Sequence, residues 1–237
     1  MKVRAFAIVL ALTVFFVGLY FLLYPKIKTA QENAKAQEAI SEFQSFLAED
    51  QPRFVPKEPS KAQPFPQLWD ACQKYNLSLY EEKQRNITSE ALSKPAVVLS
   101  DYDYNSDCFG YIRIPKAGIE TPLYLGSSLS NLDKGAAILG QTSLPIGGEN
   151  TNCVIAGHRS WSGAIKFRDL EQLVVGDEVL ITNPWETLTY EVIETKVIVP
   201  DALDEIKIRE GCDYLSIFTC TYPNTRRFLV ICQRKIV

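Results

Sequence analysis

The pattern of hydrophobic and polar positions divides the chain into stretches with different periods, and the first is apolar throughout. Residues 5–24 carry no charge and are rich in Phe, Leu and Val. A helix of that length spans about 30 Å, the thickness of a hydrocarbon core. A cleaved signal peptide is the alternative, with Ala34-Lys35-Ala36 as a cleavage site. The run is longer than the apolar part of such a peptide, so we expect residues 1–28 to be an uncleaved membrane anchor.

A helical period follows the anchor. Apolar residues spaced three or four apart predict an amphipathic helix over residues 29–50, whose stripe needs a packing partner. Five prolines within residues 51–66 forbid helix and favour an extended spacer. A second apolar stripe predicts another helix over residues 67–84. We therefore assign residues 29–66 to a helix and linker, and residues 67–107 to an N-terminal helix and lid region.

From residue 108 the period becomes that of strands. Short β-branched and aromatic runs alternate there with Gly and Pro turn signals. The runs are 109–114, 121–125, 136–139, 152–156, 178–182, 187–199, 214–219 and 228–232. Short helices are expected only at residues 127–134 and 163–173. This pattern predicts a mainly β fold, a closed or nearly closed barrel over residues 108–237, rather than a doubly wound sheet.

Composition removes several classes of function. The chain has 237 residues, of which 46% are hydrophobic, and a net charge of −3. Disordered and polytopic membrane proteins are excluded. The absence of a basic excess argues against a nucleic-acid partner. Six cysteines show no C-x-x-C spacing, and His158 is the only histidine. We therefore expect neither a metal site nor a cofactor, and we expect most of the cysteines to be free buried thiols.

The last two strand runs bring two candidate catalytic side chains together. They form a hairpin closed by residues 221–226, so that Cys220 leaves one strand where Arg227 enters its neighbour. The run 152–156 ends just before His158. A cationic neighbourhood favours the nucleophilic thiolate, an imidazole can protonate a leaving amine, and a guanidinium can stabilise an oxyanion. Alone, each residue has a structural explanation; together they predict acyl transfer through a thioester.

These residues match a family. Gly157-His158-Arg159, the segment Ser216–Cys220 and the segment Asn224–Val230 resemble the histidine, cysteine and arginine motifs of sortases, the membrane-anchored cysteine transpeptidases of Gram-positive surfaces. The resemblance covers roughly residues 67–237. It implies an eight-stranded sortase-like β-barrel with Cys220 as nucleophile, His158 as acid and base, and Arg227 on the oxyanion side.

Within the family, class C, the pilin polymerases, is most similar. The segments Gly110–Pro115, Lys134–Ala137 and Ser143–Pro145 carry this likeness, and the 62-residue interval from His158 to Cys220 leaves no room for the inserted helix of class B. The resemblance implies cleavage of a Leu-Pro-x-Thr-Gly-like sorting signal between Thr and Gly. The acyl group then passes to a pilin lysine in pilus assembly. Anchoring of surface proteins to a cell-wall cross-bridge, as housekeeping sortases do, is the alternative.

Four further residues are assigned from their positions beside these motifs. Thr219 and Arg226 are expected to contact substrate, and Arg226 competes with Arg227 for the arginine role. No Asp-Pro-aromatic lid motif precedes the barrel, so Tyr102 and Tyr104 are the candidates for covering the thiol, with a solvated loop as the alternative.

The partners expected are therefore sorting signals, an acceptor amine and the membrane. A single-pass N-terminal anchor is expected to hold the catalytic barrel outside the cell. Two other functions stay open. A hydrolase would deliver the acyl group to water, and a non-enzymatic membrane-tethered β-domain would only bind a partner.

Overall fold

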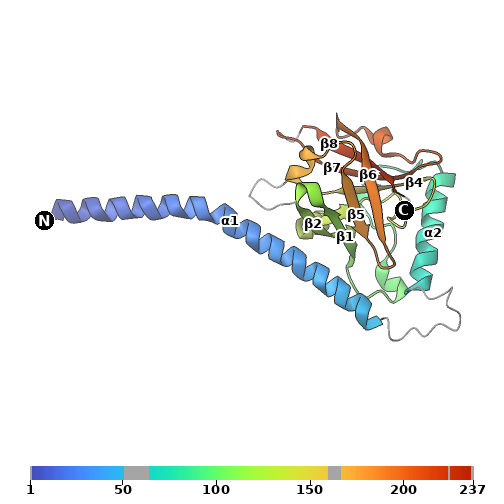
Figure 1. The fold of residues 1–237 in the computed structure, drawn as a ribbon, viewed down its shortest axis with the longest axis horizontal. Helices are drawn as coiled ribbons and strands as arrows, with labels where there is room; N and C mark the ends of the chain where they lie inside the picture. The colour runs from blue at the N-terminus through green and yellow to red at the C-terminus, as the bar shows by residue number, and fades with distance from the viewer. Residues whose placement is uncertain (1, 51–63, 160–166, 224, 236–237) are drawn as a thin grey trace.

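The computed structural model describes residues 2–50, 64–159, 167–223 and 225–235 (Figure 1). Eight strands close into a barrel in the order β1-β2-β3-β4-β7-β8-β6-β5. This confirms the predicted mainly β fold. The strands are β1 Cys108–Ile114, β2 Ile119–Leu125, β3 Ala136–Ile138, β4 Thr151–Ala156, β5 Glu178–Thr182, β6 Thr187–Ile198, β7 Asp213–Cys220 and β8 Arg227–Arg234.

Two of the strand pairs are parallel, and one of them positions the site. β2 pairs with β3 in parallel, and β4 pairs with β7 in parallel, while the other neighbours are antiparallel. After β4 the chain forms β5 and β6 in another part of the barrel wall and then returns as β7 beside β4. Because β4 and β7 run in the same direction, their carboxyl ends meet at one rim.

Alternation along β7 and β8 separates two apolar layers. Leu215, Ile217 and Val230 are buried in the main core inside the barrel. Their neighbours in the chain point outward, as strand geometry requires. Phe218 and Leu229 thus join a second cluster, outside the sheet, which is completed by residues of the loop between β6 and β7. The outer face of β4, β7 and β8 is therefore covered in part, and the candidate residues lie at its edge.

A single long helix connects the apolar N-terminus to the barrel. Helix α1 runs from Lys2 to Asp50 and includes Pro25. Proline removes a backbone hydrogen bond inside a helix, which accounts for the bend seen partway along α1 in Figure 1. Within the described residues, α1 is the one helix long and apolar enough to cross a membrane, and its most apolar window is unburied. The boundary expected at residue 28 lies inside this helix.

The second half of α1 packs against the barrel, as its apolar stripe predicted. Ile40 and Phe43 are 4% and 1% exposed, and the ring of Phe43 meets that of Tyr111 on β1 edge to face. The side chain of Gln37 donates a hydrogen bond to Glu120 on β2 at 2.8 Å. The partner that the stripe requires is therefore the outer face of β1 and β2.

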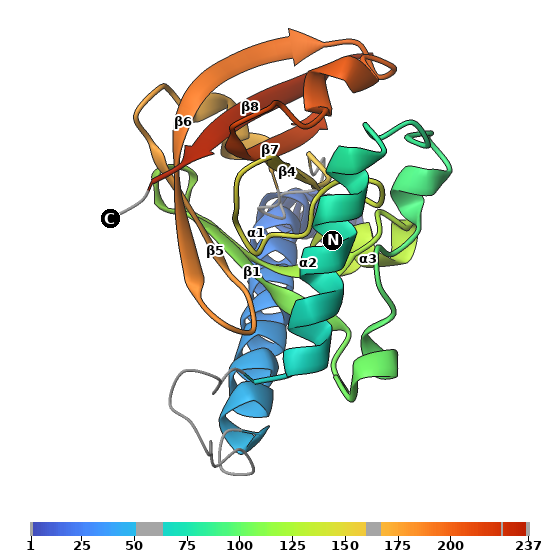
Figure 2. The same cartoon turned by 90° about the vertical axis from the view of Figure 1, so that its right-hand side faces the viewer.

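Helix α2, Pro66–Glu81, confirms the helix predicted over residues 67–84 and lies across another side of the barrel (Figure 2). Its buried Asn76 both donates to and accepts from the backbone of Leu144, at 3.1 and 2.7 Å. The predicted linker over residues 51–66 lies mostly outside the described residues.

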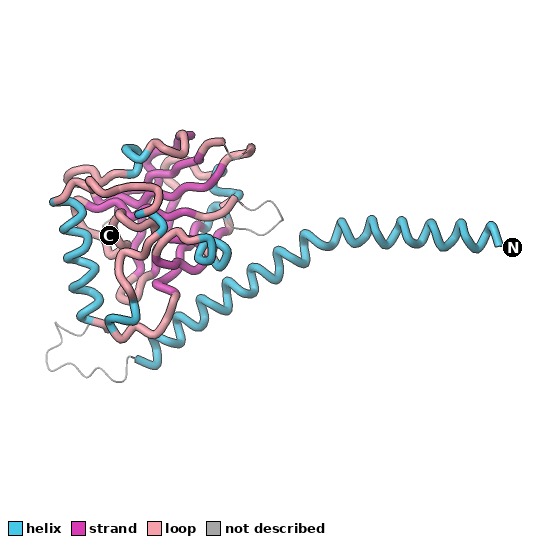
Figure 3. The backbone as a smooth tube through the Cα atoms, turned by 180° about the vertical axis from the view of Figure 1, so that it is seen from behind, coloured by secondary structure: helices cyan, strands magenta, loops and turns pink. Residues whose placement is uncertain are grey.

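Short helices lie in the connections between the strands and in the segment between α2 and β1 (Figure 3). The helix predicted at residues 127–134 is α3, Leu129–Lys134, and the described part of the one predicted at 163–173 is the 3₁₀ helix η6. Four further 3₁₀ helices had no clear periodic signal, since each is a single turn. The 3₁₀ helices are η3 Ala91–Ser93, η4 Leu99–Tyr102, η5 Pro115–Ala117, η6 Arg168–Gln172 and η7 Leu203–Ile206.

Candidate active site

Three strand ends bring Cys220, His158 and Arg227 to one level on the outer face of the sheet. Cys220 ends β7 and stands opposite Arg227, which begins β8. β4 runs parallel to β7, and its pairing continues to Gly157, whose amide donates to a β7 carbonyl at 3.3 Å. Continued by one residue, this register sets His158 beside Cys220. The half-buried free thiol thus lies on the middle strand of three, which are about 4.8 Å apart.

The backbone around His158 is held from two sides. The hydroxyl of Thr219 donates to the carbonyl of Gly157 at 2.8 Å, and the amide of Phe167 donates to the carbonyl of His158 at 3.0 Å. A Cβ added to Gly157 would lie 2.5 Å from the buried ring of Phe167. Only glycine therefore fits before His158. Thr219 is 1% exposed, so its hydroxyl serves this link between β7 and β4.

Arg227 and Arg226 differ in where they lie. Arg227 is half-buried at the first position of β8, level with Cys220, and its guanidinium donates to the carbonyl of Arg226 at 3.2 Å. Arg226 is exposed, and its carbonyl also accepts from the amide of Thr221 at 3.0 Å, which closes the hairpin loop. Arg227 is thus the arginine brought into register with the thiol.

A carboxylate that sequence reasoning missed stands beside the imidazole. Asp133 Oδ1 lies 3.7 Å from His158 Nε2. Asp133 belongs to α3, which is fixed at its start because the side chain of Asn131 donates to the carbonyls of Leu125 and Gly126, both at 2.9 Å. No sequence signal singled out this contact, because it depends on β3 lying beside β4.

A pocket of about 180 Å³ opens next to Arg227 and extends over the outer face of the sheet as far as Leu139, which pairs with β4. Its floor includes Phe218, which alternation along β7 places on the same face as Cys220. Its apolar walls come from the β6–β7 connection and from the segment around η3, and three polar side chains complete it. The lining residues are Ser89, Leu92, Ser127, Leu139, Ile198, Pro200, Ala202, Leu203, Ile206, Phe218 and Arg227. The pocket suits a short apolar side chain near a guanidinium.

The segment after α2, rather than the two tyrosines, borders this pocket. Leu92 is anchored through its carbonyl, which accepts from the amides of Gly140 and Ser127 at 2.9 and 3.3 Å. Tyr104 is 1% exposed, and its hydroxyl donates to the carbonyl of Cys108 at 2.8 Å. Tyr102 is half-buried against the main core. Both tyrosines therefore contribute their rings to the main apolar core, and neither lines the pocket beside Arg227.

The other cysteines divide by burial. Cys72, Cys108, Cys153 and Cys232 are buried, whereas Cys212 is half-buried like Cys220. Burial raises the pKa of the Cys72 thiol to about 12 and that of Cys108 to about 11. Burial also raises the pKa values of Cys153 and Cys232 well above that of an ordinary thiol. Those four thiols are therefore protonated at neutral pH.

Known proteins are similar to the part of the chain that forms the barrel and carries these residues. A family model described as the sortase domain matches residues 112–235. Sortase D of Bacillus subtilis is 30% identical over 114 residues, which cover 48% of this chain and 54% of that protein. Sortase A of Streptococcus agalactiae is 26% identical over 132 residues, which cover 54% of this chain and 53% of that protein. The chain thus spans about half the length of the curated relatives it matches.

Solved structures are matched over more of their length. Sortase C from Clostridium perfringens, determined with the C-terminal cell wall sorting motif, superposes with a TM-score of 0.67 and 31% identity, over 85% of this chain and 100% of that chain. Sortase C of Streptococcus pneumoniae superposes with a TM-score of 0.68 and 29% identity, over 84% of this chain and 97% of that chain.

Proposed function

Because the chain belongs to the sortase family, we propose that it is a cysteine transpeptidase that cleaves a Leu-Pro-x-Thr-Gly-like sorting signal between Thr and Gly. The single observation that carries this proposal is the register of β4, β7 and β8, which sets Cys220 between His158 and Arg227. A nucleophile, an acid or base and a fixed cation on adjacent strands form the set of groups that thioester chemistry needs.

The reaction proceeds in two acyl transfers. The sulfur of Cys220 attacks the carbonyl carbon of the signal threonine, and the C–N bond to glycine breaks as His158 gives its proton to the leaving amine. The thioester is then attacked by an incoming amine, which loses a proton to His158 as the C–S bond breaks. Arg227 faces the oxyanion that develops in both steps and stabilises it. The enzyme returns to its starting protonation state.

The pocket beside Arg227 supports a peptide donor. Its apolar walls accommodate a leucine side chain of the signal, and Arg227 at its border can donate to the peptide carbonyls that follow. Phe218 on the floor and Leu92 on the wall are then substrate contacts. Arg226 lies outside this pocket lining.

We further propose a pilin lysine as the acceptor and a place in pilus assembly. Two observations favour this over anchoring to the cell wall: the similar solved structures include several sortases C, and the one from Streptococcus pneumoniae is described in terms of pilin substrate specificity. The apolar half of α1 would hold the barrel at the outer surface of the cell membrane.

The test is to incubate the full chain in mild detergent with a sorting-signal peptide and to identify the products by mass. We expect a thioester adduct on Cys220 and, with added amine, the ligated peptide. Cys220→Ala abolishes both, whereas Cys212→Ala, the matched half-buried control, retains both. Ligation by the Cys220→Ala protein would contradict the proposal. Release of free acid alone, at saturating amine, would identify a hydrolase instead.

A further inference from the structure

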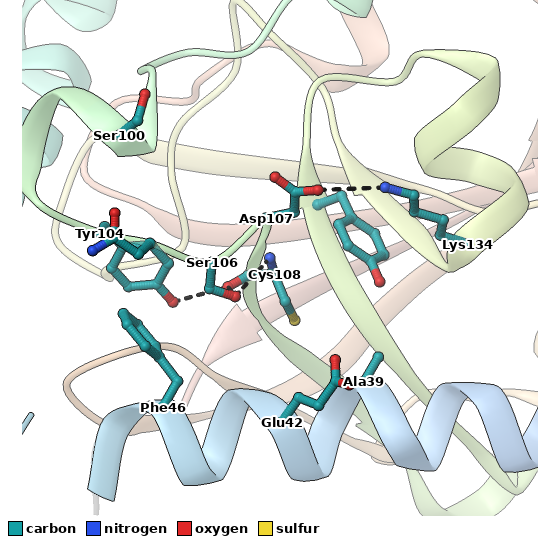
Figure 4. Close-up of a pocket in the computed structure, with 11 residues that line it drawn as sticks. Ala39, Glu42, Phe46, Ser100, Tyr104, Ser106, Asp107, Cys108 and Lys134 are labelled. Atoms are coloured by element: carbon teal, nitrogen blue, oxygen red, sulfur yellow. Dashed lines mark hydrogen bonds and ion pairs between the residues drawn. The ribbon is translucent and has the colours of Figure 1, made fainter. Parts of the chain in front are cut away.

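A second, larger cavity of about 690 Å³ lies between α1 and the barrel, away from the pocket beside Arg227 (Figure 4). Glu42 points into it from α1, and Asp107 and Lys134 face each other across its barrel side at 3.5 Å. Glu42 has no ion-pair partner in the part of the chain that the structure describes. Two carboxylates against one ammonium give the cavity a net negative charge.

The cavity is also lined by a tyrosine whose hydroxyl no described residue binds. Tyr124 is 6% exposed and lines the cavity, and its hydroxyl has no hydrogen-bond partner among the residues described. Burial, with the nearby Cys108 and the carboxylates of Asp107 and Glu42, raises the pKa of Tyr124 to about 12. The hydroxyl is therefore neutral at pH 7. The hydroxyl is open to the cavity, since the enclosed side-chain polar atoms without a partner among the described residues are Asn152 Oδ1 and Ser216 Oγ. It can therefore meet a ligand that enters the cavity.

Together these groups favour a basic side chain. Carboxylates and a hydroxyl accept hydrogen bonds from an ammonium or guanidinium, and an aromatic face attracts a cation. The protein's own Lys134 illustrates the fit, since its ammonium meets Asp107 and stands 5.6 Å from the centre of the Tyr124 ring. Glu42 and the Tyr124 hydroxyl remain available for a second cation.

The cavity lies on the His158 side of the thiol. In the strand order, β4 and β3 separate β7 from β2, which carries Tyr124, while Arg227 lies on β8 beyond Cys220. Three strand steps correspond to about 14 Å. Helix α3 joins the two places, because Asp133 contacts His158 and the adjacent Lys134 lines the cavity. A chain that presents its amine to His158 can therefore extend over this cavity.

We propose that this cavity is an acceptor subsite, which binds a basic side chain of the polypeptide that supplies the attacking amine. The inference rests on the transpeptidase function proposed above and assigns the pocket beside Arg227 and this cavity different roles. The sorting signal occupies the pocket beside Arg227. The acceptor polypeptide lies across α3. Its basic residue contacts Glu42, and its attacking amine lies beside His158.

The test compares two acceptor peptides that differ in one charge. Each carries one reactive lysine and, five residues before or after it, either arginine or its neutral analogue citrulline. Five extended residues cover about 16 Å, enough to reach from the thioester to the cavity. At low peptide concentration we expect the full chain to ligate the arginine peptide about fivefold faster than the citrulline peptide, as a charge-assisted hydrogen bond allows.

Two variants of α1 locate the effect. In Glu42→Gln the ratio of the two rates should fall close to one. Glu38 is another exposed glutamate of α1 and does not line the cavity, so in Glu38→Gln the ratio should stay as in the unmodified protein. An arginine preference that survives Glu42→Gln, or no preference in the unmodified protein, overturns the proposal. The proposal is also overturned if Glu42→Gln leaves the ratio of the two rates unchanged and only weakens binding of the full chain to phosphatidylcholine vesicles.

Thioester formation with the sorting-signal peptide alone is measured first and separates the two proposals. Its absence contradicts the transpeptidase function. Its presence, combined with equal rates for the arginine and citrulline peptides, contradicts the acceptor subsite only.

Discussion

The cysteines differ in how far water reaches them, and that difference predicts their reactivity. Cys212 and Cys220 are half-buried, while Cys72 and Cys108 are buried with pKa values raised to about 12 and about 11. Because the thiolate is the reacting form, buried protonated thiols are inert at neutral pH. We expect a brief treatment of the folded protein with iodoacetamide at pH 7 to modify Cys220 and Cys212 only, as read by peptide mass spectrometry.

The unfolded protein is the control for this labelling, since all six cysteines should then react. Rapid modification of Cys153 in the folded state would contradict the assignment of β4, because that side chain lies on the inner face of the barrel. Cys212→Ala leaves one reactive thiol and makes the rate at Cys220 measurable by itself.

At the level of elements, the end of β4 depends on the lack of a side chain at Gly157. An added Cβ would meet the ring of Phe167 at 2.5 Å, and Phe167 holds the carbonyl of His158. Gly157→Ala should therefore displace His158 and lower the rate of thioester formation at least tenfold, with a loss of about 1–3 kcal/mol in stability, typical of overpacking. Thioester formation quenched at fixed times measures the rate, and urea unfolding measures the stability separately.

A second substitution checks the cause. Phe167→Leu in the Gly157→Ala background removes ring atoms that the new methyl group meets, so it should restore part of the rate. If the double variant is as slow as Gly157→Ala while its stability recovers, the displacement of His158 has another origin. A Gly157→Ala protein with unchanged rate would show that the ring moves without the imidazole.

The elements could be predicted from the sequence, because each has its own period. All eight strand runs were found within about two residues, and the β7–β8 hairpin followed from its turn residues. Contacts between distant elements could not be predicted in this way. Three such contacts depend on tertiary arrangement: the parallel pairing of β4 with β7, the position of Asp133 beside His158, and the edge-to-face contact of Tyr104 with Phe46 of α1. Leu92 and Phe218 line the same pocket only because the closed barrel brings their segments together.

At the scale of the whole molecule, the half-buried carboxylate of Asp213 couples stability to pH. Asp213, at the start of β7, accepts hydrogen bonds from the amide of Gly148 at 2.8 Å and from the hydroxyl of Tyr190 at 3.2 Å. These bonds and the nearby Arg234 favour its charged form. Burial opposes them and is the largest effect, so the pKa of Asp213 is raised above its ordinary value. The folded protein thus binds a proton at Asp213 more readily than the unfolded chain does.

The consequence is a defined direction of pH dependence. The contribution of Asp213 to stability is complete below the pKa of the unfolded chain, about 3.9, and is lost as pH rises through the raised folded pKa. Asp213→Asn removes this titration and, by losing an acceptor, adds a pH-independent cost of about 1 kcal/mol. The free energy of unfolding of the full chain in detergent, minus that of Asp213→Asn, should therefore fall as pH rises from 4 and level off near neutrality. A difference that grows with pH would mean that the hydrogen bonds and Arg234 outweigh burial, and that the barrel is stabilised by the charged carboxylate.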